Sequence, residues 1–383
     1  MKKILVINTK YQITGGEDSN IVDEIKFLQK YYEVEYLEFN NSKIGIFELF
    51  SFFLTSNFKS NKDLKQRLSK FKPDLVYIHN TWFKANLGIF KVLKNQDIET
   101  VVKIHNFRYY CAKSYLIKNH IKEDRKCSAC NLDRKSSKIL NKYFTDSTWK
   151  SLILVRFTRK FITILKQQNL KILTITKFHK QFLLDLGIAE RKISLYPNPI
   201  EIRDKNIKKK KAESDYVLYA GRLSKDKGLE ELLKSWKKAS IQNLNLKIIG
   251  VGPLENKLKN EYLDSNILFL GYLDNDAVLK EIENARAVVT ATKMYEGQPR
   301  LLCEASSLGT PAIYPSFGGM DEFFPNDYMF SFKQFDYEDL IQKLNGLNDK
   351  EMIEKESSRV FTFISEKLKA TKMINDFQEA IKH

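Results

Sequence analysis

The sequence has 383 residues, enough for two or three domains, and its 43% hydrophobic and 29% charged residues are typical of a globular protein rather than a disordered chain. Lys and Arg number 64 against 47 Asp and Glu, so the formal net charge of +17 favours anionic partners: nucleic acid, phosphorylated metabolites or an acidic membrane surface. Four cysteines in a chain of this length do not build a disulfide scaffold.

The amino-terminal residues do not predict a signal peptide. The first apolar run, residues 4–7, is short, and polar residues follow it at once. No uncharged apolar stretch reaches the roughly 18 residues that a membrane-spanning helix needs. We therefore expect a cytoplasmic protein, in solution or on the inner face of the cell membrane.

Short apolar runs alternate with helix-like stretches in the first half of the chain. The runs predict strands at residues 4–7, 34–39, 75–78, 101–104 and 172–175. Residues 21–28 have helical spacing and follow the pair Gly15-Gly16. An alternation of strands and helices is typical of a parallel sheet built from βαβ units.

The segment 196–199, with two prolines, interrupts this rhythm, and the lysine-rich run 205–211 is typical of a solvated linker. Strands are then predicted at residues 216–220, 246–249, 267–270, 287–290 and 312–314, with a helix at 229–239. We therefore predict two Rossmann-like domains, residues 1–198 and 199–365. The helical pattern at the end predicts that residues 366–383 pack back on the first domain.

The loop of residues 221–228 follows a predicted strand and opens a predicted helix. Such a loop presents backbone N–H groups and the positive end of the helix dipole to an anion. Arg222 and Lys227 add two charges there, and a diphosphate fits them because Arg binds phosphate as a fork and Lys as a point charge. The alternative is a solvated charged loop in which Lys225 and Asp226 have no role.

Glu296 and Glu304 flank the start of a further predicted helix. Pro299 suits the first helical turn, so Glu296 is expected in the preceding loop and Glu304 inside the helix. Eight helical residues span about 12 Å, whereas the paired carboxylates of retaining glycosidases lie about 5 Å apart. The spacing instead suits one elongated ligand, with a hexose and a ribose at its ends and a diphosphate between them. The alternative is two capping or surface glutamates.

Two weaker signals lie in the first half. Gly15-Gly16 follows the first strand and would let the backbone approach a ligand, although most such pairs are simply turns. His105 follows the strand at 101–104, at an edge where functional residues collect, but a structural histidine bonded to backbone is equally consistent with this position.

In this order, the motifs resemble the family-4 retaining glycosyltransferases with the GT-B architecture, of the bacterial surface-polysaccharide type. The resemblance covers nearly the whole chain. The segments that carry it are Gly15-Gly16-Glu17, His105, residues 172–175 and 197–201, Gly221-Arg222 with Lys227-Gly228, residues 249–253, residues 268–272, Glu296 with Glu304, and residues 309–313. The resemblance implies an α/β fold in which two Rossmann-like parallel-sheet domains face a central cleft, with residues 1–198 on the acceptor side and residues 199–365 binding the nucleotide sugar.

The resemblance also implies a reaction. It is a retaining, metal-independent hexosyl transfer from a nucleotide-diphosphate donor to a glycan or polyprenyl-linked acceptor, in capsule, exopolysaccharide or lipopolysaccharide synthesis, with no cofactor. Arg222 and Lys227 would bind the diphosphate, Glu296 the transferred sugar and Glu304 the ribose.

His105 would lie beside the donor sugar, which makes it, with Glu296, a predicted catalytic residue, while Gly15 and Gly16 would lie near the phosphates and the acceptor. Thr176-Lys177 departs from the Ser that relatives often have after the strand at 172–175. Arg300 is an extra cation beside Glu296. Its guanidinium could contact the diphosphate or an acidic donor sugar, but the default expectation is that it contacts only water.

The cysteines pose a separate question. Cys127 and Cys130 form a C-x2-C pair, with Cys111 and His120 upstream, and three thiols with one imidazole could hold a structural zinc ion. The second C-x2-C half of common zinc sites is absent, so reduced thiols in a flap after His105 are favoured. Cys303 is expected in the core.

Residues 44–58 and 149–165 each suit either a core helix or a basic, apolar helix lying on anionic lipid. Two other functions also remain open. A sugar-nucleotide epimerase can share this architecture, although the two glutamates with Arg222 and Lys227 fit it less well. A nucleic-acid-binding protein is suggested by charge alone, and the chain has no recognisable reading motif, so no nucleic-acid partner is expected.

Overall fold

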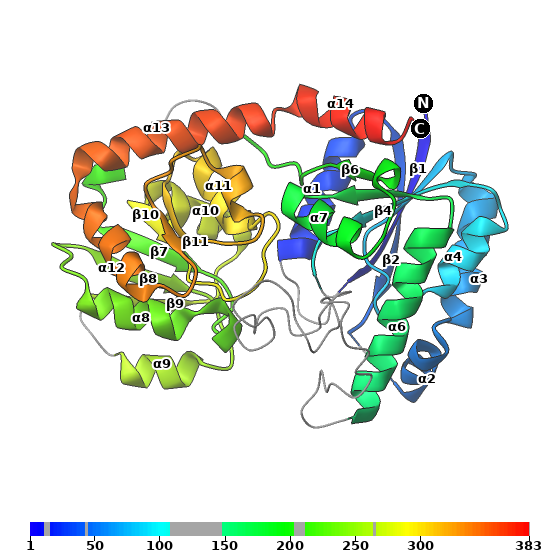
Figure 1. The fold of residues 1–383 in the computed structure, drawn as a ribbon, viewed down its shortest axis with the longest axis horizontal. Coiled ribbons are helices and arrows are strands. Elements are labelled where there is room, and N and C mark those ends of the chain that lie inside the picture. Colours follow the sequence, from blue (N-terminus) through cyan, green and yellow to red (C-terminus); the bar gives the residue numbers. More distant parts are fainter. Residues whose placement is uncertain (11–15, 43–44, 108–147, 203–210, 263–265, 383) are drawn as a thin grey trace. The chain divides into compact units, whose positions relative to one another are not determined.

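The computed structural model describes residues 1–10, 16–42, 45–107, 148–202, 211–262 and 266–382. The chain divides into two compact units (Figure 1). The first unit ends at Pro199 and resumes at Ala370, and the second runs from Ile200 to Lys369. Within the described residues, no helix has the length and apolar character needed to cross a bilayer.

The first unit is built on a six-stranded parallel sheet in the order β2-β1-β3-β4-β5-β6. Its strands are β1 (Lys3–Lys10), β2 (Glu33–Asn40), β3 (Leu75–Ile78), β4 (Glu99–Ile104), β5 (Lys171–Thr174) and β6 (Ile193–Leu195). The five strands predicted in this half are confirmed. The prediction missed β6, a three-residue strand at the edge of the sheet.

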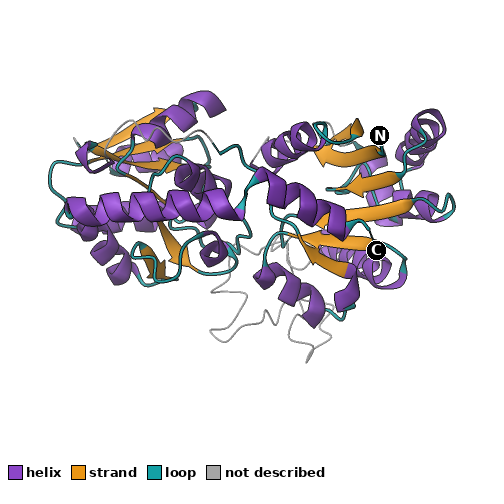
Figure 2. Cartoon of the chain, turned by 90° about the horizontal axis from the view of Figure 1, so that it is seen from above, coloured by secondary structure: helices purple, strands orange, loops and turns teal. Residues whose placement is uncertain are grey.

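Helices flank this sheet on both sides (Figure 2). They are α1 (Gly16–Leu28), α2 (Ile46–Leu54), α3 (Phe58–Phe71), α4 (Gly88–Lys94), α6 (Thr148–Gln167), α7 (Lys177–Asp185) and α14 (Ala370–Ala380). Polar caps define their starts: Asn57 caps α3, and the Thr176 hydroxyl accepts from the His179 N–H (3.1 Å) at the start of α7. Thr176, one of the departures from the family pattern, is therefore the N-cap of α7.

The second unit has its own six-stranded parallel sheet, in the order β12-β11-β10-β7-β8-β9. Its strands are β7 (Tyr216–Ala220), β8 (Asn245–Ile249), β9 (Ile267–Gly271), β10 (Ala287–Val289), β11 (Ala312–Ser316) and β12 (Ser331–Lys333), and its helices are α8 (Leu229–Lys238), α9 (Glu255–Glu261), α10 (Asn275–Asn284), α11 (Arg300–Ser307), α12 (Tyr337–Asn345) and α13 (Lys350–Lys367). The five predicted strands of this half are confirmed, and β12 was missed.

The helical pattern at the end of the chain forms two helices. The first, α13, belongs to the second unit, whereas α14 belongs to the first. The ring of Phe377 on α14 packs against three buried tyrosine rings of the first unit, Tyr32, Tyr77 and Tyr196, at centroid distances of 5.9, 5.5 and 5.2 Å. The last residues of the chain thereby complete the core of the first unit.

Lys211 corrects the prediction of a solvated linker at residues 205–211. It begins a 3-10 turn (Lys211–Glu213), is 3% exposed, and donates from Nζ to the Glu283 carbonyl oxygen. Lys211 is therefore part of the second unit. The rest of the predicted linker, residues 205–210, lies outside the described residues.

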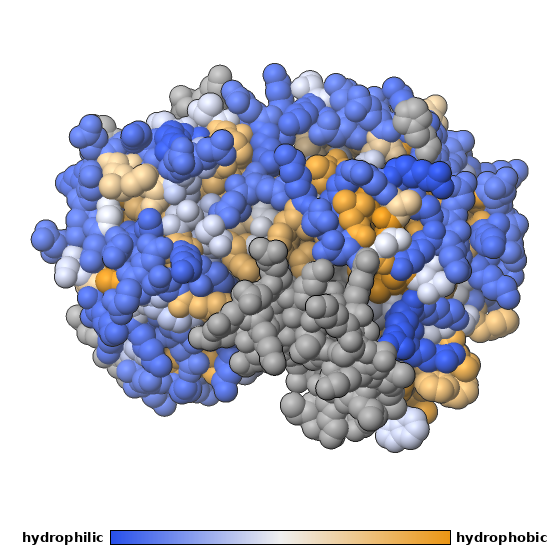
Figure 3. Space-filling model, in the orientation of Figure 1, coloured by the Kyte–Doolittle hydropathy of each residue, from blue (hydrophilic) through white to orange (hydrophobic). Residues whose placement is uncertain are grey.

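The apolar side chains of α2 face solvent, so an ordinary core helix is the wrong interpretation for this stretch. Only Ser51 and Phe52 on α2 are buried, whereas Ile46 is 87% and Phe50 58% exposed. Apolar atoms gather at this edge of the unit in the surface view (Figure 3). Helix α6 does behave as a core helix, since Phe157 and Phe161 on it are buried.

Candidate functional site

Two loops at the carboxyl ends of neighbouring strands pack closely in the second unit. Beyond the end of β7, the Gly221 N–H donates to the Ile249 carbonyl oxygen (3.0 Å). Gly250 has φ +129°, and a Cβ at this position would lie 2.0 Å from the Gly221 carbonyl oxygen. Only glycine fits so close an approach. The glycine thus permits the loop after β8 to brace the loop that carries Arg222.

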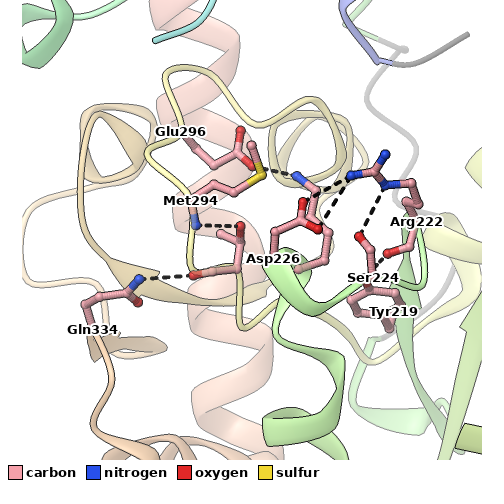
Figure 4. Close-up of polar contacts among 9 residues, drawn as sticks. Tyr219, Arg222, Ser224, Asp226, Met294, Glu296 and Gln334 are labelled. Atoms are coloured by element: carbon pink, nitrogen blue, oxygen red, sulfur yellow. Dashed lines mark hydrogen bonds and ion pairs between the residues drawn. The ribbon is translucent and has the colours of Figure 1, made fainter. Parts of the chain in front are cut away.

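Arg222 is held in one orientation by two side chains (Figure 4). Its Nε donates to the Ser224 Oγ (3.2 Å), and its Nη2 lies 3.3 Å from the Asp226 carboxylate. Asp226 is buried, whereas the Arg222 side chain is 54% exposed. Asp226 therefore has a role, contrary to the interpretation of this loop as surface charge. The exposed guanidinium keeps a donor edge toward solvent, as phosphate binding requires.

Lys227 and Glu296 form an ion pair although 69 residues separate them. The Lys227 Nζ lies 2.7 Å from the Glu296 Oε1, and both side chains are partly exposed. The backbone fixes this geometry, because the Lys293 N–H donates to the Asp226 carbonyl oxygen and the Gly319 N–H to that of Glu296, each at 2.9 Å. The structure thus brings together Lys227, which was predicted to bind the diphosphate, and Glu296, which was predicted to bind the transferred sugar.

Helix α11 starts directly after Pro299, which is its N-cap, so Glu296 lies in the preceding loop and Glu304 within the helix, as predicted. Within the described residues, Pro299 makes no side-chain cap to this helix, and no acidic residue lies in its first turn. Arg300 in that turn places its Nε 2.6 Å from the Glu304 Oε1, and both side chains are largely buried. The expectation that Arg300 meets only water is therefore wrong.

The first turn of α8 contains two carboxylates. Glu230 pairs with Lys257, and Glu231 pairs with Lys293. These carboxylates already interact favourably with the positive end of the α8 dipole. The uncapped amino terminus of α11 is therefore better suited to an anion than that of α8, on which the sequence interpretation of residues 221–228 relied.

In the first unit, His105 follows β4 and pairs with a histidine that the sequence analysis missed. The His105 Nε2 lies 2.7 Å from the Nδ1 of His79, which follows β3. Burial lowers the pKa of both imidazoles well below the usual value, and the cation of Lys103 lowers both further. His105 is thus bonded to a side chain rather than to backbone. The signal for His79 was available, because it follows its strand directly, as His105 does.

Gly16 is the first residue of α1, and Gly15 lies outside the described residues. Beside Gly16, Glu17 accepts a hydrogen bond from the Asn106 Nδ2 (2.7 Å), which ties the start of α1 to the residue after His105. The structure therefore brings the segments of Gly16 and His105 together within the first unit.

The cysteine cluster (Cys111, His120, Cys127 and Cys130) also lies outside the described residues. In the part of the chain that the structure describes, no group of three or more His, Cys, Asp or Glu side chains is placed to hold a metal ion. Cys303 is fully buried on α11, and burial raises the pKa of its thiol, as expected of a core cysteine.

Comparison with known proteins gives a consistent result. Residues 201–360 match the family model described as glycosyl transferases group 1. An uncharacterized glycosyltransferase of Methanocaldococcus jannaschii is 24% identical over 57% of this chain and 55% of its own length. The capsular polysaccharide biosynthesis glycosyltransferase CapM of Staphylococcus aureus is 26% identical over 44% of this chain and 45% of its own length. The chain thus spans about half the length of each of these two relatives.

Among solved structures, Anabaena HepE in complex with UDP and glucose has a TM-score of 0.68 at 13% identity, covering 100% of this chain and 99% of that chain. This likeness shows the fold. Two α/β units, each with a six-stranded parallel sheet, give the chain the GT-B fold that the resemblance implies.

Proposed function

We propose that this chain, whose residues 201–360 match the family model of the glycosyl transferases group 1, is a glycosyltransferase that moves a hexosyl group from a nucleotide-diphosphate donor to a glycan or polyprenyl-linked acceptor. The name of CapM, a capsular polysaccharide biosynthesis glycosyltransferase, supports a role in surface-polysaccharide synthesis. HepE was crystallised with UDP and glucose, which supports a nucleotide-sugar donor. Relatives with transferase names favour transfer over the epimerase and nucleic-acid alternatives.

The ion pair of Lys227 with Glu296, next to the anchored Arg222, is the observation that carries this proposal. The Lys227 ammonium has three donors, so it can keep Glu296 and still bind a phosphate oxygen. Arg222 binds the same diphosphate from its exposed edge. Glu296 is then positioned to accept hydrogen bonds from sugar hydroxyls next to that diphosphate.

We propose that the transfer retains the anomeric configuration and needs no metal ion. The bond between the sugar C1 and the donor phosphate oxygen breaks on the face where the acceptor oxygen bonds to C1, and the acceptor proton passes to the departing phosphate. Arg222, Lys227 and the uncapped α11 terminus stabilise the developing negative charge. Glu304, fixed by Arg300, is assigned to the nucleotide ribose, and His105 to the donor sugar.

The donor assignment is tested by thermal unfolding with UDP-, GDP-, ADP- and TDP-sugars. A ligand at about 100 times its Kd stabilises the native state by about 2.7 kcal/mol, which for a unit of this size raises Tm by about 5–10 °C. Arg222→Ala and Lys227→Ala should remove the shift, whereas the matched control Lys280→Ala, an exposed lysine on α10, should keep it. An unchanged shift in the first two variants would refute the diphosphate site. Donor consumption without added acceptor would favour the epimerase.

We also propose that the protein contacts an anionic membrane, at the inner face of the cell membrane, through a surface centred on α2. The members of this α2 surface are apolar and exposed: Ile46, Phe47, Leu49, Phe50, Phe53, Leu54 and Phe58. Basic side chains adjoin it, since the Arg156 guanidinium lies 5.6 Å from the centre of the Phe53 ring and Lys59 is exposed beside Phe58. Apolar side chains bordered by cations match the interfacial region of an anionic bilayer.

Flotation with vesicles tests this contact. The protein should float with vesicles that contain phosphatidylglycerol and much less with pure phosphatidylcholine. Phe50→Asp should weaken flotation, whereas Met329→Asp, at an exposed apolar residue of the second unit, should not. If the wild-type protein stays in the dense fraction with anionic vesicles, the membrane proposal fails.

A further inference from the structure

Three exposed cations from two helices gather next to the α2 surface. Arg156 and Lys160 are one turn apart on α6 and therefore share a face of that helix. Lys91, on α4, is the third. Burial lowers the pKa of Lys160, and the charges of Arg156 and Lys91 lower it further, so the three cations act on one another at short range. We call these three residues the cation cluster.

The cation cluster and the α2 surface are parts of one continuous surface. The Phe52 ring of α2 stacks on the Phe157 ring, which lies between the two cations of α6, at a centroid distance of 4.3 Å. The Lys160 Nζ donates to the hydroxyl of Thr55, the buried C-cap of α2. These contacts fix α2 beside the cations. In the surface view, strongly hydrophilic atoms border the apolar atoms at this edge of the unit (Figure 3).

The cation cluster has no counter-charge within the described part of the chain. No carboxylate there forms an ion pair with any of its three members. The other end of α2 is different, because the carboxylate of Glu48 lies near Lys59 and Lys84. Like charges one turn apart on a helix destabilise it, and a partly desolvated ammonium adds to that cost. A bound anion would remove both penalties, so the cluster is suited to an anionic ligand.

The number of charges and the neighbouring apolar side chains narrow the choice of anion. A phosphomonoester carries about 1.5 to 2 negative charges near pH 7, and a diphosphate carries at least as many, whereas a phosphodiester has a single ionised oxygen. Arg binds phosphate oxygens as a fork, and Lys160 keeps two N–H donors after its bond to Thr55. The exposed apolar side chains of α2 suit a hydrocarbon chain attached to that phosphate.

We propose that the cation cluster binds the phosphomonoester or diphosphate headgroup of a single lipid molecule, whose hydrocarbon chain lies against the α2 surface. The proposal goes beyond the membrane contact described above, because it selects one class of headgroup rather than any anionic bilayer. A polyprenyl-linked acceptor with a diphosphate has this chemistry. That the bound lipid is the acceptor rests on the proposed function, whereas the selection of the headgroup does not.

Calorimetric titration with short-chain lipids that stay monomeric in water tests the headgroup. Dihexanoyl phosphatidic acid, a phosphomonoester, should bind one per protein and about tenfold more tightly than dihexanoyl phosphatidylglycerol, a phosphodiester with the same chains. Lys91→Ala and Arg156→Ala should each weaken the phosphatidic acid about fivefold to twentyfold, as expected for a lost charge-assisted hydrogen bond. The matched control Lys70→Ala, at an exposed lysine of α3, should change nothing. Equal affinity for the two lipids, no binding of either, or wild-type affinity in both cluster variants overturns the proposal.

Two further arms identify the source of the phosphate and separate this site from the donor site. Inorganic phosphate, which lacks a hydrocarbon chain, should bind at least about tenfold more weakly than phosphatidic acid; equal affinity overturns the assignment to a lipid. Arg222→Ala should leave the affinity for phosphatidic acid unchanged. If it removes that binding, the lipid phosphate occupies the second unit and the proposal is wrong. If no donor sugar is transferred or shifts Tm, the proposed function fails, while the titrations still decide the lipid site.

Discussion

The ion pair of Lys103 and Glu24 gives the sharpest test of how the first unit is stabilised. Both side chains are 0% exposed, and their charged atoms are 2.8 Å apart. Glu24 also accepts from the Tyr77 O–H (2.6 Å), and Lys103 donates to the Pro197 carbonyl oxygen (3.3 Å) and lies over the Tyr196 ring. The pair therefore links α1, β3, β4 and the segment that leads to the second unit.

Lys103→Met removes one charge and leaves the Glu24 carboxylate buried with the Tyr77 hydroxyl as its main partner. Breaking a buried pair in this way costs about 3–5 kcal/mol, because the remaining charge is no longer compensated. For a unit of roughly 200 residues this corresponds to a fall in Tm of about 6–20 °C. The double variant Lys103→Met with Glu24→Gln removes both charges and should recover much of the loss.

Calorimetry separates the two units, because the pair belongs entirely to the first. The transition of the first unit should move, and that of the second unit should stay in place. The matched control is Lys3→Met, which breaks an exposed pair with Glu33 (3.5 Å) and should change Tm by no more than about 2 °C. If Lys103→Met is as mild as this control, or if the double variant is worse than the single, the reasoning is wrong.

Three further outcomes follow from the structure. Burial lowers the pKa of His79, His105 and His179, the last to about 3. Below about pH 6.5 the unfolded chain therefore binds protons that the native state does not bind. The free energy of unfolding should then fall on acidification, by up to about 4 kcal/mol per pH unit for the three histidines. Urea unfolding at pH 7, 6 and 5 measures this; a flat profile contradicts it. Gly250→Ala should destabilise the second unit by at least about 2 kcal/mol, because its Cβ would clash with the Gly221 carbonyl oxygen. Gly271→Ala should destabilise it by less, because Gly271 also has a positive φ (+70°) but open space around it. Equal falls in Tm for the two variants would exclude this clash as the cause. Arg300→Met should weaken nucleotide binding in calorimetric titration by leaving Glu304 unoriented; unchanged affinity would remove that role.

The sequence predicted the interior strands well because they are buried on both faces and appear as continuous apolar runs. Strands β3 and β7 were predicted to the residue. The two missed strands, β6 and β12, are three residues long, contain polar residues and lie at the edges of their sheets, where one side lacks a neighbouring strand. Nothing in their local pattern separates them from loops.

The elements that carry the candidate site residues could be predicted, but the pairing of their side chains could not. Spacing placed Glu296 in a loop and Glu304 in a helix, and both positions are confirmed. That Lys227 would pair with Glu296 depends on backbone bonds of Lys293 and Gly319, which no local pattern reveals. Likewise, α2 has the composition of a core helix, and only the tertiary structure shows that most of its apolar side chains are exposed.

The docking of α14 limits how this protein can be divided experimentally. A fragment that stopped at Pro199 would contain every strand of the first sheet but would lack Phe377, whose ring fills the space between Tyr32, Tyr77 and Tyr196. Such a fragment would open a hollow lined by aromatic rings next to a buried charge pair, and would be expected to aggregate. An autonomous version of this half should therefore be made by joining residues 370–383 to it through a flexible linker.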